Sequence, residues 1–230
     1  MNDAVRNVLE VKNLDKAFRQ GPRRIEVLNG INLELEAGHS LAIVGASGAG
    51  KSTLLQILGG LDRPDTGEVF VNGESIWEMS EDERGSLRNK YMGFVYQFHH
   101  LLAEFTALEN VAMPLLIRGE TAAFALEKAA SLLGKVGLEH RLDHIPGEMS
   151  GGERQRAAVA RALVGSPALI LGDEPTGNLD EATAEAVYRQ ILELNRELGT
   201  SLVLVTHDHN LAGRMDRCLE LSKGHLAILK

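Results

Sequence analysis

The chain contains 230 residues, which is long enough to bury one full core. It has 24 Lys and Arg against 32 Asp and Glu, for a formal net charge of −8 at pH 7, and it lacks the clustered basic residues of a general nucleic-acid-binding surface. No uncharged apolar stretch approaches the roughly 20 residues that cross a bilayer, and the first residues lack the apolar centre of a signal peptide. The one cysteine, Cys218, excludes an intrachain disulfide and suits a reducing compartment, so we expect a cytoplasmic protein without direct membrane insertion and without a nucleic-acid partner.

Short apolar runs bounded by turn residues dominate the first hundred residues. The strands predicted there cover residues 8–14, 27–35, 41–44, 67–71, 74–76 and 91–96. A polar, proline-containing loop at 19–24 is expected to separate the first two strands. The pair Asn72-Gly73 suits a type I′ turn, which predicts a hairpin at that point.

Helical patterns fill most of the middle of the chain. Helices are predicted at residues 52–58, 80–89, 107–118, 121–134, 151–164 and from about 180 onward. Ser80 and Glu83 form a capping box at the start of the second of these helices, and Pro114 is expected to kink or end the third. The buried face of the last helix is predicted to carry Val187, Ile191, Leu194 and Leu198.

Strands return near the C-terminus at 168–171 and 201–205, followed by a hairpin around Lys223-Gly224. Strand and helix alternation at both ends, broken by a helical block, predicts one α/β domain with a parallel-sheet core. We expect the core at about residues 1–97 and 165–230, with an N-terminal antiparallel β subdomain and an inserted α-helical subdomain at about 98–164.

A glycine-rich segment lies between the strand at 41–44 and the helix at 52–58. It matches G-x-x-x-x-G-K-[ST] without deviation and predicts a phosphate-binding loop of the P-loop NTPase (RecA-like) kind. Its backbone N–H groups can hold phosphate oxygens, Lys51 adds a positive charge, and Ser52 is placed to bind Mg²⁺. An ordinary glycine turn is the alternative, which the flanking strand and helix disfavour. The predicted nucleotide contacts are Gly45, Ala46, Ser47, Gly48, Ala49, Gly50, Lys51, Ser52 and Thr53.

Two carboxylates, Asp173 and Glu174, end the apolar strand at 168–171, at the sheet edge where open α/β proteins bind ligands. Asp173 is a candidate Mg²⁺ ligand, and Glu174 is the candidate that orients or deprotonates an attacking water. A solvated acidic pair is common at a strand end, but the phosphate loop in the same chain favours the catalytic interpretation.

Three further residues are candidates because of their positions. His207 follows the strand at 201–205 and could donate a hydrogen bond to a γ-phosphate, and Gln97 ends the strand at 91–96, where an amide could contact both Mg²⁺ and the attacking water. Phe18 could stack on adenine. Each has a plainer alternative, since most histidines and aromatic residues are ordinary core or surface residues.

A second glycine turn, Ser150-Gly151-Gly152, opens the helix predicted at 151–164. Its free N–H groups and helix dipole form a second phosphate site, worth roughly 0.3–1 kcal/mol from the dipole alone. One nucleotide does not need two such sites within one chain. We therefore expect two copies of the chain to pair head to tail, with each glycine turn closing the ATP of its partner.

The order of these motifs resembles the ATPase subunits of ABC transporters over essentially the whole chain. The resemblance implies binding and hydrolysis of ATP with Mg²⁺, adenine stacking on Phe18, nucleotide contacts from Ser150 through Glu153, and a loop ending at Asp180 that signals across the dimer. Three departures are modest: Glu153 stands where many members have Gln, Met149 where many have Leu, and Phe18 where Tyr is more frequent.

A narrower resemblance covers residues 96–102 and 105–117, which are similar to the ATPases of lipoprotein-releasing systems. It implies transfer of lipoproteins from the bacterial inner membrane to a periplasmic carrier, with this chain on the cytoplasmic face and membrane subunits docking near Gln97 to Ile117. An apolar surface at the edge of the helical block would suit such docking. The alternative is that Phe98, Leu101 and Leu102 are plain core.

Three other functions share some of these motifs. The ATPase of a macrolide-efflux or cell-division complex would differ only on the docking surface. A soluble ABC-type ATPase would need a second cassette, a coiled-coil insertion or a basic tail, and the sequence contains none of these. A small-molecule kinase or GTPase would have no use for the second glycine turn.

Overall fold

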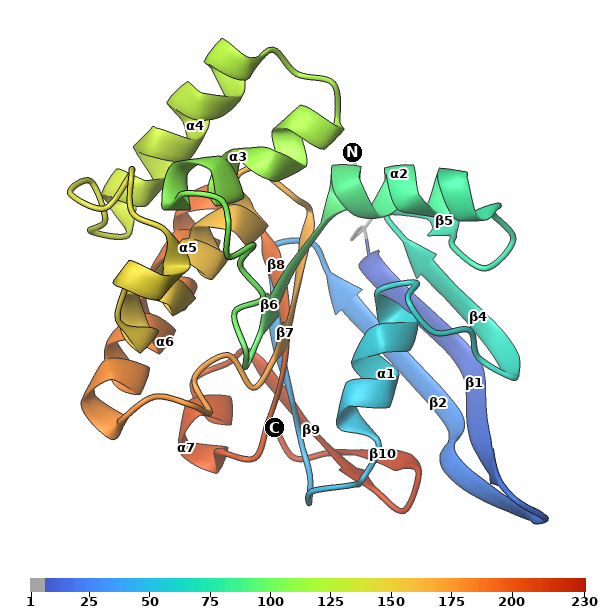
Figure 1. The fold of residues 1–230 in the computed structure, drawn as a ribbon. Helices are drawn as coiled ribbons and strands as arrows, with labels where there is room; N and C mark the ends of the chain where they lie inside the picture. Colours follow the sequence, from blue (N-terminus) through green and yellow to red (C-terminus); the bar gives the residue numbers. More distant parts are fainter. Residues whose placement is uncertain (1–6) are drawn as a thin grey trace, which may run out of the picture.

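The computed structural model describes residues 7–230, which form two β-sheets with helices between and beside them (Figure 1). The N-terminal sheet has the order β2-β1-β4-β5 and is antiparallel throughout. Its strands are β1 (Asn7–Gln20), β2 (Arg23–Glu36), β4 (Thr66–Val71) and β5 (Glu74–Ser75). The hairpin predicted at Asn72-Gly73 joins β4 to β5, and both turn residues have positive φ, as a type I′ turn requires.

The loop predicted at residues 19–24 is wrong, because β1 and β2 continue through it. Arg19 pairs with Arg24 and Gln20 with Arg23, so only residues 21 and 22 form the turn. Pro22 therefore lies where no ladder hydrogen bond is required of it. Arg19, Arg23 and Arg24, whose polar side chains suggested a loop, are exposed on a two-stranded arm, where backbone pairing rather than burial maintains the strands.

The second sheet has the order β10-β9-β3-β8-β7-β6, and only its edge strand β10 is antiparallel (Figure 1). Its strands are β3 (Ser40–Val44), β6 (Met92–Tyr96), β7 (Leu169–Asp173), β8 (Ser201–Thr206), β9 (Arg217–Ser222) and β10 (His225–Ile228). The inner strands are apolar runs because both faces of the sheet are covered. This architecture confirms the predicted fold class, including the antiparallel β subdomain and the helices inserted between β6 and β7.

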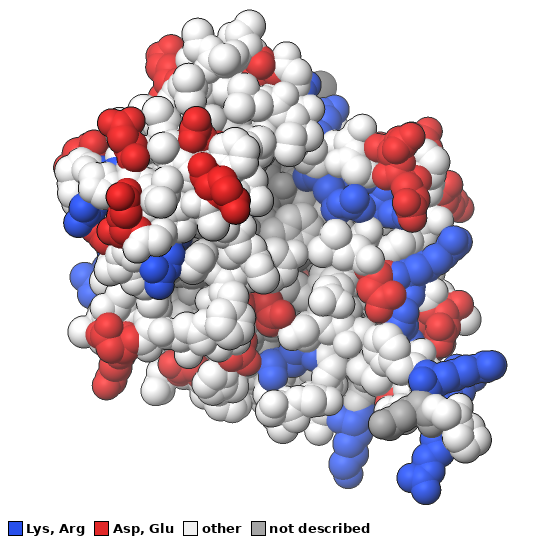
Figure 2. All heavy atoms as spheres, viewed as in Figure 1, with Lys and Arg blue, Asp and Glu red and all other residues white. Residues whose placement is uncertain are grey.

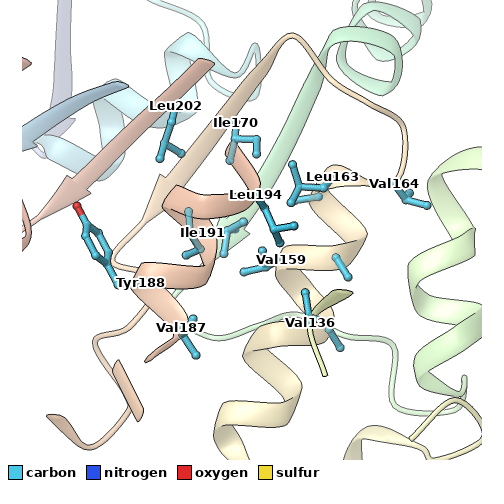
Figure 3. Packing of buried hydrophobic residues seen from close by; sticks show 14 of the residues in the cluster. Val136, Val159, Leu163, Val164, Ile170, Val187, Tyr188, Ile191, Leu194 and Leu202 are labelled. Carbon is cyan, nitrogen blue, oxygen red and sulfur yellow. The ribbon is translucent and has the colours of Figure 1, made fainter. Parts of the chain in front are cut away.

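Alternate residues of the parallel strands enter two hydrophobic cores. Leu41 and Ile43 of β3 face the core shared with the antiparallel sheet and α1 (Lys51–Leu58). Ala42 and Val44 face the opposite core, which the helices after β6 complete. Figure 3 shows part of that second core, where Ile170 and Leu202 of the sheet meet α5 (Gly151–Leu163) and α6 (Glu181–Leu198). Cys218 is buried in this core.

The predicted helices are confirmed, with small differences. The remaining helices are α2 (Glu81–Tyr91), α3 (Ala107–Ile117), α4 (Ala122–Lys135), the four-residue α7 (His209–Ala212) and the 3₁₀ turn η1 (Pro146–Glu148). Pro114 does not end α3 where it stands, because the helix continues to Ile117. Leu198 is exposed rather than buried, since α6 ends there beyond the core. Among residues 7–230, no helix combines the length and apolar character needed to span a membrane.

Close contact between β6 and α5 depends on a glycine. A Cβ atom built at Gly93 would overlap the carbonyl oxygen of Ala162 and lie 2.9 Å from its carbonyl carbon. The obstacle is helix backbone, which cannot rotate away as a flexible side chain could. Gly93 thus sets the distance between the sheet and the helix that begins at Ser150.

We expect Gly93→Ala to lower the free energy of unfolding by at least about 1–3 kcal/mol, because the extra methyl forces β6 and α5 apart. Thermal unfolding followed by circular dichroism measures this loss, because each kcal/mol lowers the melting temperature of a chain of this size by roughly 2–4 °C. Gly134→Ala in α4 is the matched control: its Cβ meets no heavy atom within 4 Å, so helix propensity should make it neutral or slightly stabilising. Equal melting temperatures for the two variants would contradict this account of the packing.

Candidate functional site

The turn between β3 and α1 presents an uncapped helix N-terminus. Every other helix of six or more residues in the described chain has a side-chain cap on its first turn, but α1 begins at Gly50 with no cap and no acidic residue in its first turn. Gly50 has a φ of 101°, and a Cβ there would lie 2.6 Å from Cγ1 of Val27, so only glycine fits. The free N–H groups and the dipole of α1 together favour an anion at this point.

Lys51 adds a full positive charge to the same point. Its side chain is buried, and its Nζ donates to the carbonyl oxygens of Gly45 (2.8 Å) and Ala46 (3.2 Å). No carboxylate pairs with it among the described residues. A buried ammonium held only by carbonyl groups retains most of its charge for an incoming anion.

A cavity of about 510 Å³ lies over this turn. It brings together the end of β1, the glycine turn, and the carboxyl ends of β6 and β7, which are far apart in the sequence. The cavity is lined by Phe18, Val27, Ser47, Gly48, Gly50, Lys51, Ser52, Thr53, Gln97, Asp173 and Glu174. Gly45, Ala46 and Ala49 belong to the same turn but do not line the cavity. Val27 was not predicted, because nothing in its local sequence distinguishes it from a core residue.

Phe18 is 43 % exposed at the mouth of the cavity. The Nζ atom of Lys16 lies 5.0 Å from the centre of its ring, which is a cation–π distance. Lys16 itself is anchored by Asp62 (2.8 Å). One face of the aromatic ring is thus engaged by a fixed cation, and the ring is held at the cavity edge.

The two carboxylates after β7 lie in different environments. Burial raises the pKa of Asp173, and a hydrogen bond from the Ser52 side chain opposes that rise. Glu174 adopts a positive φ of 44°, a strained conformation for a non-glycine residue, while its N–H donates to Val205 (2.9 Å). Its Oε2 lies 2.8 Å from Nδ1 of His207, which follows the neighbouring strand β8. The side chain of Glu174 is therefore oriented by a partner from the next strand.

Gln97 and Asp180 contact the loop that follows β7. Nε2 of Gln97 donates to Oδ1 of Asn178 (2.7 Å), and Nδ2 of Asn178 donates back to the carbonyl of Gln97 (3.3 Å). Asp180 accepts from the N–H of Thr183 (3.0 Å) and caps α6. It lies outside the cavity described above, in a neighbouring hollow of about 920 Å³ that also includes Glu174 and His207.

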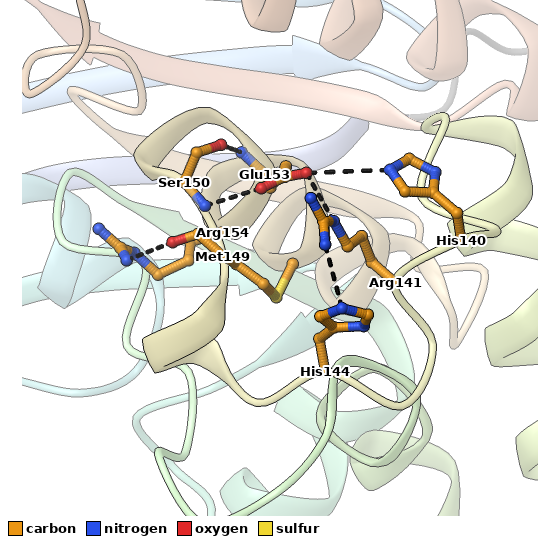
Figure 4. Close-up of polar contacts among 7 residues, drawn as sticks. All are labelled: His140, Arg141, His144, Met149, Ser150, Glu153 and Arg154. Atoms are coloured by element: carbon orange, nitrogen blue, oxygen red, sulfur yellow. Dashed lines mark hydrogen bonds and ion pairs between the residues drawn. The ribbon is translucent and has the colours of Figure 1, made fainter.

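The second glycine turn lies outside the cavity as well. Ser150 caps α5: its Oγ accepts from the N–H of Glu153 (3.3 Å), and its own N–H donates to Oε2 of Glu153 (2.7 Å). Two arginines hold the turn from different sides, as Figure 4 shows. Arg154 donates to the carbonyl of Met149 (2.7 Å), and Nε of Arg141 donates to Oε1 of Glu153 (2.9 Å). The side chain of Glu153 is thus used within the chain, and a nucleotide contact from it stays a prediction.

The residues that could hold a metal ion are few. Among the described residues, no group of three or more His, Cys, Asp or Glu side chains is arranged to bind a metal. Ser52 and Asp173 place a hydroxyl and a carboxylate within hydrogen-bonding distance of each other at the cavity wall, and the Gln97 amide lines the same cavity. Oxygen donors of this kind fit Mg²⁺, which takes one or two protein ligands and completes its shell with phosphate and water.

A groove of about 420 Å³ lies between β6, α3 and the end of α5. Its floor includes Met92, Phe94, Met113 and Pro114, and basic residues border it. Figure 2 shows Lys and Arg side chains beneath α2, next to the hollow between the two halves of the molecule. Arg88, Arg118 and Arg161 each bond to carbonyl oxygens (of Gly60, Gly165 and His100), and within the described chain none of the three pairs with a carboxylate.

Exposed apolar side chains line the same groove at Leu102 and Ile117, and another, Phe98, lies in the segment after β6. Phe98 is 65 % exposed and Ile117 is 71 % exposed, and Leu102 is exposed too. The alternative was that Phe98, Leu101 and Leu102 are core residues, and of these three only Leu101 packs against the core. The apolar surface predicted for this segment is therefore present at Phe98 and Leu102.

Comparison with known proteins agrees with this geometry. The sequence profile of the ABC transporter family matches residues 28–177. The lipoprotein-releasing system ATP-binding protein LolD of Xanthomonas axonopodis pv. citri (strain 306) is 59 % identical over 219 residues, covering 95 % of this chain and 90 % of that protein. LolD of Saccharophagus degradans is 56 % identical over 219 residues, with coverages of 95 % and 96 %.

Solved structures agree as well. The dimeric ATP-binding cassette MJ0796, in a post-hydrolysis state bound to ADP and Pi, superposes with a TM-score of 0.88 at 36 % identity, covering 96 % of this chain and 99 % of that one. A second dimeric structure of MJ0796, described as a bacterial ABC transporter cassette, gives the same TM-score at 37 % identity. The chain therefore belongs to the ABC transporter family, as an ATPase cassette whose relatives include the LolD proteins.

Proposed function

We propose that this chain is the ATP-hydrolysing subunit of a membrane complex that releases lipoproteins from the inner membrane to a periplasmic carrier, and that it works as a head-to-tail dimer. One observation carries the proposal. The cavity that joins the phosphate loop to Asp173, Glu174 and Gln97 has no contribution from the Ser150 turn of the same chain. A second copy supplies that turn, so catalysis requires pairing.

In each copy, the α1 N-terminus and Lys51 bind the phosphates of ATP, and Phe18 stacks on the adenine. Lys51 exchanges its carbonyl partners for phosphate oxygens, which gives its ammonium a negatively charged partner at hydrogen-bonding distance. Ser52, Asp173 and Gln97 are the residues that would hold Mg²⁺, which would supply positive charge beside the terminal phosphates. The Gln97 amide would be available for this role only without its bond to Asn178.

Closure of the dimer brings Ser150, Gly151 and Gly152 of one copy to the γ-phosphate held by the other. Their N–H groups lie at the positive end of the α5 dipole, which is aimed at a negative ligand. ATP binds the closed dimer more tightly than the separated copies, and this difference shifts the population toward closure. Asp180, at the start of α6, carries the change across the interface.

Glu174 orients and deprotonates the attacking water. Its positive φ and its bond to His207 restrict the carboxylate to one direction, so little reorganisation is needed at the moment of reaction. His207 also donates to the γ-phosphate. Loss of the γ-phosphate removes the group that both copies share, and the dimer reopens.

The groove between β6 and α3 is the docking site for the membrane subunits. It lies between the helical subdomain of about residues 98–164, which moves as a block, and the core of about 1–97 and 165–230. The apolar floor and the groove arginines Arg88 and Arg161, which form no ion pair in the described chain, favour a partner segment that is apolar with acidic residues at its edges. This contact holds the chain at the cytoplasmic face of the membrane. The LolD relatives favour lipoprotein release over macrolide efflux or cell division.

We expect Glu174→Gln to bind ATP normally and to hydrolyse it about 10²–10⁴-fold more slowly, a loss of roughly 3–5 kcal/mol of barrier lowering. The amide keeps the shape of the side chain but cannot accept a proton. Steady-state ATPase assays and equilibrium ATP binding measure the two effects. Turnover near that of the unaltered chain would remove Glu174 from the role of general base.

Gly151→Asp is expected to leave ATP binding by the monomer intact and to abolish ATP-dependent pairing, because a carboxylate at this turn repels the partner's γ-phosphate. The site has room for a side chain in the monomer, since a Cβ there meets only Leu179 at 3.5 Å. Light scattering with ATP in the Glu174→Gln background gives the mass directly. Gly134→Asp, also in open space, is the control. A dimer of the Gly151 variant would contradict the composite site.

Ile117→Asp should reduce the recovery of membrane subunits with the tagged chain from detergent-solubilised membranes by tenfold or more, while ATP binding is unchanged. A charge on the apolar rim of the groove opposes burial of the partner. Ile228→Asp is the matched control and should not change the recovery, because Ile228 is 76 % exposed on β10, away from the groove. Identification of the recovered proteins also tests the lipoprotein-releasing assignment, which subunits of an efflux or cell-division complex would refute.

A further inference from the structure

Three α-helices in the described part of the chain begin with a capping box, and one of them differs from the other two. Glu83 and Glu109 close the boxes of α2 and α3, and within the described chain neither forms an ion pair. Glu153 closes the box of α5 and is the one of the three that also contacts a guanidinium, that of Arg141. A glutamate can therefore close a capping box without an arginine partner.

The contact is well defined (Figure 4). Each oxygen of the Glu153 carboxylate has its own donor: the Ser150 N–H on Oε2 (2.7 Å) and Nε of Arg141 on Oε1 (2.9 Å). Nη1 of Arg141 lies 3.0 Å from Nε2 of His144, which accepts from it when neutral. Only 13 % of the Glu153 side chain is exposed, so water provides little screening. His140 is more distant, with its Nε2 at 3.9 Å from Oε1.

The segment that carries Arg141 is fixed to the helical block through its backbone. The N–H of Arg141 donates to the carbonyl oxygen of Leu138 (2.9 Å). The residues after Arg141 accept from the start of α3: the N–H of Leu108 donates to the carbonyl of Leu142 (3.0 Å), and the N–H of Ala107 donates to that of His144 (2.8 Å). The guanidinium is therefore presented to Glu153 from a rigid support. Such support distinguishes it from an exposed ion pair between two flexible side chains.

A carboxylate in the first turn of α5 creates a conflict. It stabilises the helix by interacting with the dipole, but the same N-terminus must receive a γ-phosphate, and two negative charges repel. The pKa of Glu153 is lowered to about 2, first by the bond from the Ser150 N–H and further by Arg141, so the carboxylate is ionised under all physiological conditions. Its charge has to be neutralised for the phosphate to be accepted.

We propose that Arg141 is a positioning residue for ATP-driven dimerisation: it neutralises and orients Glu153, so that the Ser150 turn can accept the γ-phosphate bound by the partner copy. This rests on the composite site proposed above and adds to it a residue outside every predicted motif. A neutral Gln at position 153 would cap the helix equally well and would not need the arginine.

A double-mutant cycle tests this, with Arg141→Met, Glu153→Gln and the combination. The measured quantity is the ATP concentration that gives half-maximal dimer in light scattering, with Glu174→Gln in all backgrounds to prevent turnover. Arg141→Met should raise that concentration about 5–30-fold, corresponding to roughly 1–2 kcal/mol. In the Glu153→Gln background the same substitution should change it less than about twofold, because no uncompensated charge remains.

Two controls separate charge compensation from a merely structural role. Lys135→Met breaks an ion pair with Glu197 on the same side of the molecule and should leave the ATP dependence unchanged. ATP binding to the monomer should be unchanged in every Arg141 variant, because the phosphate loop is untouched. Arg141→Lys keeps the positive charge and should retain most of the ATP-dependent dimerisation. It also provides a test if Arg141→Met folds poorly.

The inference is overturned if Arg141→Met dimerises at the usual ATP concentration, or if Glu153→Gln fails to suppress its effect. The second result would mean that Arg141 acts only by holding the 138–144 segment in place. Either failure is distinguishable from failure of the composite site, because in that case Gly151→Asp would also form dimers with ATP.

Discussion

The structure is organised around the positive end of α1. The α1 N-terminus has no side-chain cap, and the Nζ atom of the buried Lys51 beside it donates only to carbonyl oxygens, so positive charge is concentrated where no carboxylate of the described chain forms an ion pair with it. The other long helices are capped by their own side chains. A phosphate group gives the free N–H groups of α1 and the Lys51 ammonium a negatively charged partner, because both favour an anion at the same point. Nucleotide binding is thus part of the electrostatic balance of the domain.

The proposed catalytic groups depend on the parallel sheet for their mutual positions. Gln97, Glu174 and His207 follow β6, β7 and β8, which are neighbours in the sheet although more than a hundred residues separate the first and last along the chain. Parallel register places their carboxyl ends at one edge. The strain of Glu174 and its bond to His207 then fix a direction that the strand alone would not give.

The Ser150 turn and the apolar groove belong to one hydrogen-bonded block. Residues 138–144 connect Glu153, through Arg141, to the first residues of α3, and α3 forms one wall of the groove. Gly93 sets the separation of α5 from the sheet at the same place. In the proposed function, a membrane subunit seated in the groove and a nucleotide at the Ser150 turn act on this common element, which is the physical condition for coupling transport to ATP.

The sequence by itself determined the phosphate loop, the two carboxylates, the second glycine turn and nearly all helices and strands, because each rests on local backbone chemistry or on the periodicity of apolar residues. It failed where local polarity was a poor guide: the polar arm of β1 and β2 is held by backbone pairing, and Leu198 extends past the core. The tertiary structure alone decided that Val27 joins the cavity wall, that Phe98 is exposed while Leu101 is packed, and that Arg141 lies against Glu153. These contacts join segments with no local pattern in common, so they exist only once the sheets and helices have packed.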